Sequence, residues 1–182
     1  MHLIYVCGSH STGKSTLLDL FENYLHRETH YSCDLNPSPR TLVPINSLYS
    51  KVDDLSQFYI TFGILSKIVS CESDFYLTDR FLIDNIAYST YGAVITPQLM
   101  EIQYKHLRYF SRNLETSVFY LPLEIALERD GVRPEDLQFR ENIDNKIQEL
   151  LPLYFPQFVT LKGTPTQRLN NLVQHLREKE IL

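Results

Sequence analysis

The chain has 182 residues, of which 43% are hydrophobic and 21% charged, a composition typical of a globular protein with one core of ordinary size. The net charge of −5 argues against a protein that coats nucleic acid with its whole surface, although a local basic groove is compatible with it. The apolar run at residues 3–7 is too short to cross a bilayer and follows no basic segment of the secretory type, so we expect no membrane association.

The three cysteines, Cys7, Cys33 and Cys71, are an odd number and show no CxxC spacing. They predict buried thiols in a reducing, cytoplasmic compartment and argue against a disulfide framework or a zinc site. Nothing in the sequence indicates an obligate protein partner.

Segments typical of strands and of helices alternate along the chain, which predicts an α/β fold with a five-stranded parallel sheet and helices on both faces. The apolar run 3–7 predicts a buried strand, and apolar positions at 3.6-residue spacing predict a helix from Gly13. Residues 31–33 predict a weaker second strand, which a proline-rich loop follows. A further helix begins near Asp54, which has the features of an N-cap.

The second half of the chain continues the same alternation. Its predicted elements are a third strand at 75–78, helices at about 82–91 and 97–114, a fourth strand at 117–121, a fifth at 158–161, and a last helix from about residue 166.

The segment 8–15, Gly-Ser-His-Ser-Thr-Gly-Lys-Ser, matches the phosphate-binding pattern G-x4-G-K-S in full, between a buried strand and a helix as that pattern requires. Its two glycines allow consecutive N–H groups to turn inward around an anion, and the helix start adds a positive dipole end. We expect Lys14 to reach the β- and γ-phosphates and the Ser15 hydroxyl to bind Mg²⁺. The predicted nucleotide contacts are Gly8, Ser11, Thr12, Gly13, Lys14, Ser15 and Thr16.

Two classes of triphosphate-binding protein lack support in this sequence. A guanine-nucleotide switch needs an Asn/Thr-Lys-x-Asp motif, and the nearest segment, Asn145-Lys146-Ile147-Gln148, has no aspartate. A motor ATPase has an apolar strand that ends in Asp-Glu, whereas the third strand here is followed by Asp79-Arg80. A kinase remains.

The pair Asp79-Arg80 lies where the third strand ends, and ligands of parallel sheets bind at that edge. We expect both residues to be catalytic, with Asp79 also a ligand of Mg²⁺ beside Ser15. Asp84 is a second carboxylate near the same cleft and a candidate for substrate binding. The alternative is structural: Asp79 caps the next helix and Arg80 forms an ion pair.

A second group of arginines follows the fourth strand. Arg129 and Arg133 flank a glycine and precede a proline, and Arg140 follows on a helix. Arginines on a segment that closes over the nucleotide stabilise the charge that phosphoryl transfer concentrates on the equatorial oxygens. We therefore expect one P-loop kinase domain over residues 1–182, with a helical lid at about 124–150. The acidic neighbours leave open a charged surface turn instead.

Taken together, these motifs resemble the NadR-like, AAA-type family of P-loop kinases. The resemblance rests on the phosphate loop, Ser38-Pro39-Arg40, Gln57, Asp79-Arg80-x3-Asp84-Asn85-x-Ala87-Tyr88, Asp130-Gly131-Val132-Arg133, Phe139-Arg140 and Lys162-Gly163-Thr164. It implies ATP and Mg²⁺ as cofactors, a hydroxyl acceptor on a nucleoside-like compound, Arg40 near that acceptor, and Lys162 and Gly163 beside the adenine. Phe81 stands where many relatives have a small hydroxyl residue, so the family's substrate does not follow from the resemblance.

The acceptor stays open between two kinds of molecule. Lys105, Arg108 and Arg112 share one face of the predicted helix 97–114, beside Tyr104 and Tyr109, and such a face suits a nucleobase with its phosphates. We name Arg108 and Arg112 as candidate substrate contacts, and the alternative is an ordinary solvated face.

A free nucleoside or nucleotide is one acceptor, and a hydroxymethylated pyrimidine within viral DNA is the other, which requires a flipped base. A third interpretation is a nucleotide-sensing module without catalysis.

Overall fold

The computed structural model describes residues 1–36, 54–91, 95–125 and 137–182. Five parallel strands form one sheet in the order β2-β3-β1-β4-β5, which confirms the predicted fold class. The strands are β1 (His2–Cys7), β2 (Cys33–Leu35), β3 (Phe75–Thr78), β4 (Thr116–Tyr120) and β5 (Val159–Thr160). The helices within the described ranges are α1 (Lys14–Glu28), α4 (Asp54–Ser70), α5 (Leu82–Tyr91), α6 (Pro97–Asn113), α7 (Leu137–Tyr154) and α8 (Pro165–Glu178).

The strand β1 lies at the centre of the sheet, with β3 on one side and β4 on the other. Its register pairs Tyr5 with Thr78 and Cys7 with Tyr120, so the carboxyl ends of the three strands meet at one edge. From β1 the chain passes to β2 and β3 on one side of β1, and after β3 it crosses to β4 and β5 on the other side. The direction of winding therefore reverses at β1. Ligands of parallel sheets bind at such a reversal, outside the carboxyl ends of the strands.

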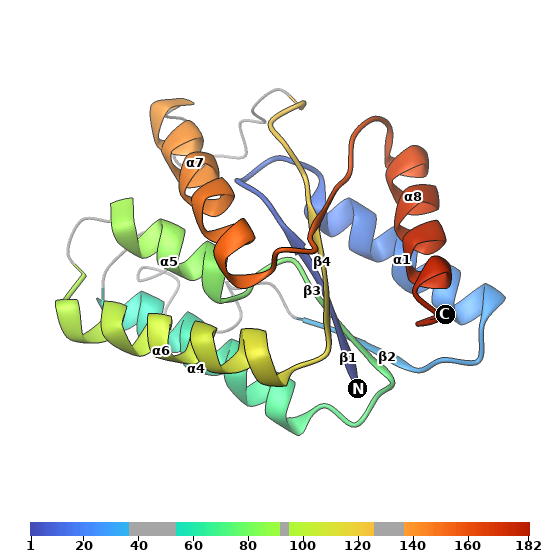
Figure 1. Ribbon diagram of the computed structural model, residues 1–182, viewed down its shortest axis with the longest axis horizontal. Helices are drawn as coiled ribbons and strands as arrows, with labels where there is room; N and C mark the ends of the chain where they lie inside the picture. Colours follow the sequence, from blue (N-terminus) through green and yellow to red (C-terminus); the bar gives the residue numbers. More distant parts are fainter. Residues whose placement is uncertain (37–53, 92–94, 126–136) are drawn as a thin grey trace.

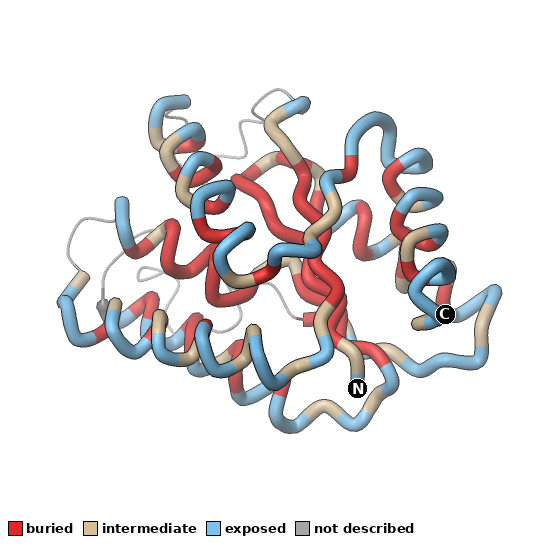
Figure 2. Tube along the Cα trace, in the orientation of Figure 1, coloured by how far each residue is buried: buried red, intermediate tan, exposed pale blue. Residues whose placement is uncertain are grey.

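Helices cover both faces of the sheet (Figure 1). One core packs α1 and α8 against Ile4 and Val6 of β1, and the other packs α4, α5 and α7 against Leu3, Tyr5 and Cys7. Because β1 is buried on both faces, it is a continuous apolar run rather than an alternating one. Figure 2 shows the buried residues concentrated on the strands and on the sides of the helices that face them.

The sequence locates most elements within one or two residues, with two differences. The second strand begins at Cys33 rather than at residue 31. From residue 137 onwards the predicted lid region 124–150 is the helix α7, which buries Ile143 and Ile147 in the core beside α5, and its role as a lid stays a prediction. Residues 126–136, the middle of the predicted lid, lie outside the described residues.

The cysteines also depart from expectation. Cys7 is buried, but Cys33 and Cys71 are partly exposed, so the prediction of three buried thiols is wrong for two of them. Burial raises the pKa of Cys7 well above its ordinary value. In the described part of the chain no helix is both long enough and apolar enough to span a membrane.

Candidate active site

The loop between β1 and α1 lies at the sheet edge where β3 and β4 also end. Its two glycines have positive φ, 143° at Gly8 and 88° at Gly13, and Ser11 has a φ of 55°. A Cβ added at Gly8 would lie 2.5 Å from the Leu121 carbonyl oxygen, which belongs to the backbone and cannot yield. Both the dihedral angles and the close approach to β4 therefore require glycine at Gly8.

Side chains of this loop and of the first residue of α1 donate hydrogen bonds to a carbonyl oxygen of the loop itself. Lys14 donates from Nζ to the Ser9 carbonyl oxygen at 2.7 Å, and Thr12 donates from Oγ1 to the same oxygen at 3.0 Å. The Lys14 side chain is buried, with 5% of its surface exposed. Its ammonium therefore lies against the loop backbone, where an anion bound by the loop would meet it.

A buried arginine on α7 holds the loop from outside. Arg140 donates to the carbonyl oxygens of His10 at 3.1 Å, Ser11 at 3.2 Å and Ile125 at 2.8 Å. In return the Ser9 hydroxyl donates to the Arg140 carbonyl oxygen at 2.9 Å. Arg140, which the sequence placed in the predicted lid, is thus buried and bonded to the loop backbone in this structure, and a lid movement stays a prediction.

A second buried arginine, on α8, continues this support. Arg168 donates to the Thr12 carbonyl oxygen at 2.7 Å and forms an ion pair with Glu124 at 3.0 Å. Glu124 also accepts a hydrogen bond from the Gly163 N–H at 3.0 Å, and this bond and Arg168 lower the pKa of the Glu124 carboxyl group. Because a buried cation is costly unless fully paired, two of them around one loop indicate that its shape is tightly determined.

The front of the loop carries two oxygen ligands in contact. Ser15, in the first turn of α1, donates from Oγ to Asp79 Oδ2 at 2.8 Å, although the residues are 64 positions apart. Asp79 follows β3 directly, so the adjacency of β1 and β3 brings the two together. A hydroxyl and a carboxylate beside a phosphate site are the oxygen donors that Mg²⁺ prefers. Thr16 is exposed next to Ser15.

Arg80 lies against aromatic side chains beside this pair. Its guanidinium carbon is 4.8 Å from the centre of the Tyr88 ring, and its Nη2 donates to the Tyr88 hydroxyl at 3.5 Å. That hydroxyl is 3.4 Å from Nδ1 of His10 in the phosphate loop. Arg80 is therefore oriented towards the loop by α5, and its side chain retains 13% exposure.

Asp84 lies below this surface rather than in the cleft. It is fully buried, accepts hydrogen bonds from the Tyr5 hydroxyl and from the Phe81 N–H at 3.2 Å, and has an oxygen 3.9 Å from Arg80 Nη1. Burial raises the pKa of Asp84, and the charges of Arg80 and Lys14 oppose that rise. The interpretation of Asp84 as a substrate contact is therefore replaced by one in which it supports Arg80 from within the core.

The basic face of α6 does not join the site. Lys105, Arg108 and Arg112 are all exposed, as expected. However, α6 ends at Asn113 and leads into the start of β4 at Thr116, which is the edge of the sheet opposite to the phosphate loop. The candidate substrate contacts Arg108 and Arg112 are therefore corrected to a solvated helix face, because the direction of the next strand fixes where α6 ends.

The other predicted residues divide into two groups. Lys162 and Gly163 follow β5 at the same edge as the loop, and Glu124 connects Gly163 to the loop through Arg168. Arg40, Arg129 and Arg133 lie outside the described residues, so their roles stay predictions.

No family model matches the sequence, and no curated protein sequence matches it either. Among solved structures, deoxyadenosine kinase from M. mycoides, with the products dCMP and dCDP bound, aligns over 97% of this chain and 99% of its own, with a TM-score of 0.62 and 14% identity. NadR protein in complex with NR aligns with a TM-score of 0.69 and 15% identity over 97% of this chain. The chain spans about half of that protein, 51%.

The chain shares the fold of these structures, an α/β fold with a five-stranded, all-parallel sheet. This similarity at 14–15% identity concerns the arrangement of the elements. The geometry of the individual residues has to support any statement about chemistry.

A group of buried polar residues between α4, α5 and α6 was not predicted as a site. Gln103 and Asn85 donate side-chain hydrogen bonds to Thr61 Oγ1, at 3.2 and 3.4 Å. Gln57 lies one turn before Thr61, in the first turn of α4, which is the end of the helix remote from the start of β3. Among the described residues, the Oε1 atoms of Gln57 and Gln103 have no hydrogen-bond partner although both residues are buried.

The sequence did contain a signal for these residues and for the two buried arginines. Gln57 and Thr61 stand four apart on the apolar face of α4, and Arg168 stands four before Leu172 on the apolar face of α8. A polar side chain at a core position of an amphipathic helix requires an internal partner. The sequence therefore shows polar side chains at core positions, and the structure shows which groups they bond to.

Proposed function

We propose that this protein is an ATP-dependent phosphotransferase that moves the γ-phosphoryl group to a hydroxyl group of a nucleoside- or nucleotide-type acceptor. The observation that carries the proposal is the hydrogen bond between Ser15 and Asp79 at 2.8 Å, in front of the loop that encloses Lys14. It joins a phosphate cradle, an oxygen donor pair and a carboxylate at the edge where ligands of such sheets bind.

In the proposed mechanism the loop N–H groups and Lys14 bind the β- and γ-phosphates. Lys14 exchanges its present bond to the Ser9 carbonyl oxygen for a phosphate oxygen. Ser15 and Asp79 would hold Mg²⁺, which when bound neutralises charge on the phosphates. Arg80, held by Tyr88, would contact the transferred group.

Asp79 orients the acceptor hydroxyl group and accepts its proton as the oxygen attacks the γ-phosphorus. The bond from that phosphorus to the bridging oxygen breaks, and ADP leaves with the electron pair. Rigid support of the loop by Arg140 and Arg168 keeps the donors in position before the nucleotide arrives, which is how such sites stabilise developing charge without reorganisation.

Two observations support a nucleoside-type acceptor. Deoxyadenosine kinase, one of the structural neighbours, is a nucleoside kinase by name, and NadR was solved with NR. The Gln57 Oε1 atom in the first turn of α4, which has no partner among the described residues, is an acceptor that suits an N–H or O–H group of a polar base. A base within DNA gains no support, because Arg108 and Arg112 end at the opposite edge of the sheet.

The test is Asp79→Asn, which keeps the side-chain shape but removes the carboxylate. We expect kcat to fall on the order of 10²–10⁴-fold, with ATP affinity changed only a few-fold. The measurements are phosphoryl transfer to the most active acceptor of a nucleoside panel, and calorimetric ATP titration. Asp19→Asn makes the same chemical change on the exposed face of α1 and should leave kcat unchanged.

An Asp79→Asn protein that transfers phosphate at the wild-type rate would remove Asp79 from the mechanism. The nucleotide-sensing interpretation would be favoured by two results together. The wild type would show no phosphoryl transfer, and the Asp79→Asn protein would still bind ATP and keep its effect on a partner.

A further inference from the structure

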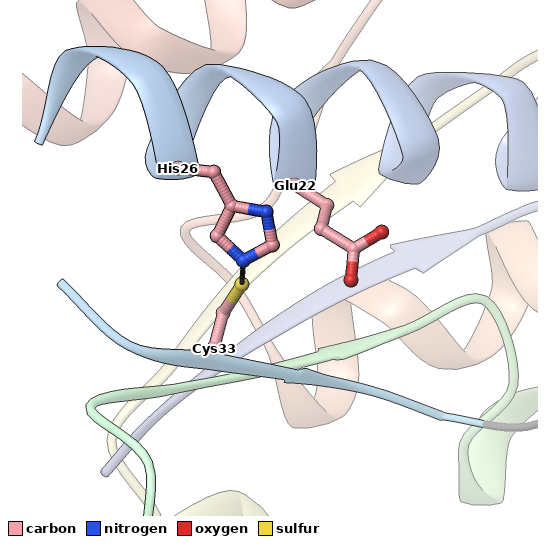
Figure 3. A group of neighbouring side chains, drawn as sticks. All are labelled: Glu22, His26 and Cys33. Carbon is pink, nitrogen blue, oxygen red and sulfur yellow. Dashed lines mark hydrogen bonds between the residues drawn. The ribbon is translucent and has the colours of Figure 1, made fainter.

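A separate group of metal-ligating side chains lies on the far end of α1 and the neighbouring edge strand β2 (Figure 3). Glu22 and His26 stand four residues apart, so they share one face of α1. Cys33 begins β2, which returns beneath that face after the turn at the end of the helix. The three side chains point toward one another, from the end of α1 that is remote from the phosphate loop.

The separation of the thiol and the imidazole matches one edge of a tetrahedral metal site, and the Glu22 carboxylate lies near enough to join them. One ligand atom from each of the three residues lies within 4.8 Å of the other two, and Cys33 Sγ and His26 Nε2 are 3.7 Å apart. Zinc–sulfur and zinc–nitrogen bonds of roughly 2.3 and 2.0–2.1 Å give a tetrahedral sulfur–nitrogen edge of about 3.6 Å. The thiol and the imidazole are thus already separated as two ligands of one ion would be.

The electrostatic surroundings favour a cation. Two carboxyl groups, those of Glu22 and Asp34, lie near the Cys33 thiol and place negative charge beside it. The group also lies at the carboxyl end of α1, where the helix dipole is negative. His26 is exposed while Glu22 and Cys33 are half-buried, so an ion can enter from solvent.

We propose that Glu22, His26 and Cys33 form a binding site for a transition-metal ion of the Zn²⁺ type, with water as the fourth ligand. A thiolate, an imidazole and a carboxylate are the donor set for Zn²⁺ rather than for Mg²⁺, which separates this site from the oxygen pair Ser15 and Asp79. The site therefore does not depend on the proposed phosphotransferase activity.

The ion would tie α1 to β2. The helix begins at the phosphate loop, and β2 continues to Asn36, whose side-chain amide donates to Thr78 Oγ1 at 2.9 Å, one residue before Asp79. A metal bridge would therefore stabilise the frame that sets the loop and β3 side by side. At about 100 times its Kd, Zn²⁺ should raise the Tm by about 5–10 °C.

The test titrates the reduced, chelator-stripped full chain with Co²⁺, followed by Zn²⁺. We expect one Co²⁺ per chain, with the charge-transfer absorption of a thiolate–cobalt bond, displaced by stoichiometric Zn²⁺ and unaffected by excess Mg²⁺. Cys33→Ser should abolish the absorption, and His26→Gln should weaken Zn²⁺ binding on the order of 100-fold or more, since even outer-shell changes cost 10–100-fold. Cys71→Ser, which changes the other half-exposed thiol, is the matched control and should behave as wild type.

Retention of the absorption in Cys33→Ser, its loss in Cys71→Ser, or equally weak binding by all variants would overturn the proposal. His26→Gln changes an exposed residue and keeps the test decisive if Cys33→Ser does not fold, and circular dichroism establishes folding for each variant.

Discussion

The two sides of the candidate site differ in how their polar groups are satisfied. On the phosphate side, the carbonyl groups of His10, Ser11 and Thr12 accept hydrogen bonds from the buried arginines of α7 and α8. On the side formed by α4, α5 and α6, the buried Oε1 atoms of Gln57 and Gln103 have no partner among the described residues.

This difference in hydrogen bonding fits the molecule that each side would bind under the proposed function, a triphosphate on one side and the acceptor on the other. A triphosphate is the same in every kinase of this kind, so a loop held from behind in one shape serves it best. An acceptor differs from one kinase to the next, and buried polar groups left for a ligand provide discrimination, because a molecule that cannot pair with them is rejected. Under the proposed function, the protein itself would satisfy the polar groups of the phosphate side, and the substrate would satisfy those of the acceptor side.

Among the substitutions that test this comparison, Arg140→Met should change stability and ATP affinity most. Three loop or strand-end carbonyl groups lose their donor, so we expect the free energy of unfolding to fall by about 2–4 kcal/mol. ATP affinity should fall roughly 10-fold, because the loop loses its fixed shape. Urea unfolding and ATP titration measure the two. Arg108→Met is the matched control on exposed α6 and should change stability by less than about 0.5 kcal/mol.

If Arg140→Met folds and binds ATP as the wild type does, the support behind the loop does not determine nucleotide binding, and the comparison fails on the phosphate side.

A smaller and more selective effect should come from Gln57→Leu. The Oε1 atom of Gln57 has no partner among the described residues, so replacing this buried side chain by an apolar one should leave the free energy of unfolding unchanged or slightly raised. KM for the acceptor should rise roughly 10-fold while KM for ATP stays constant, because a lost hydrogen bond to the acceptor costs about 1–1.5 kcal/mol. Steady-state kinetics with each substrate varied in turn separate these values.

Gln174→Leu, on α8, is the control for the same chemical change away from the acceptor side. An equal rise in both KM values for Gln57→Leu would indicate a general disturbance of the fold rather than recognition of the acceptor.

The smallest effect should come from the double substitution Arg108→Ser and Arg112→Ser. Both residues are exposed near the edge of the sheet opposite to the loop, so stability and kinetics with a small acceptor should stay within about 0.5 kcal/mol of the wild type. The contrary result would be a large loss of phosphoryl-transfer activity at low salt in the double variant and in each single variant. That result would indicate that the basic face of α6 belongs to the substrate site.

The sequence was sufficient for those parts of the fold that depend on local patterns. The strand β3 was predicted at its observed bounds because Phe75–Thr78 is a short apolar run ended by polar residues. The glycine pattern likewise located the turn between β1 and α1, since its positive φ angles are a local requirement, and phosphate binding by this turn stays a prediction.

Interactions that depend on topology were not predictable in the same way. Arg140 and Arg168 bond to backbone carbonyl groups, which every residue carries and no sequence pattern marks. Asp84 was placed in the cleft because it follows Asp79 closely, yet the start of α5 turns it towards Tyr5 in the core. The basic face of α6 was recognised correctly as a face, but its position depends on where β4 begins.

The measurement that tests the central claim most directly is a transfer screen with γ-labelled ATP over free nucleosides, nucleotides, plain DNA and hydroxymethylated DNA. The account predicts label in a small molecule, dependent on Mg²⁺ and abolished by Asp79→Asn. Label only in hydroxymethylated DNA, or release of labelled phosphate without transfer to any acceptor, would contradict it.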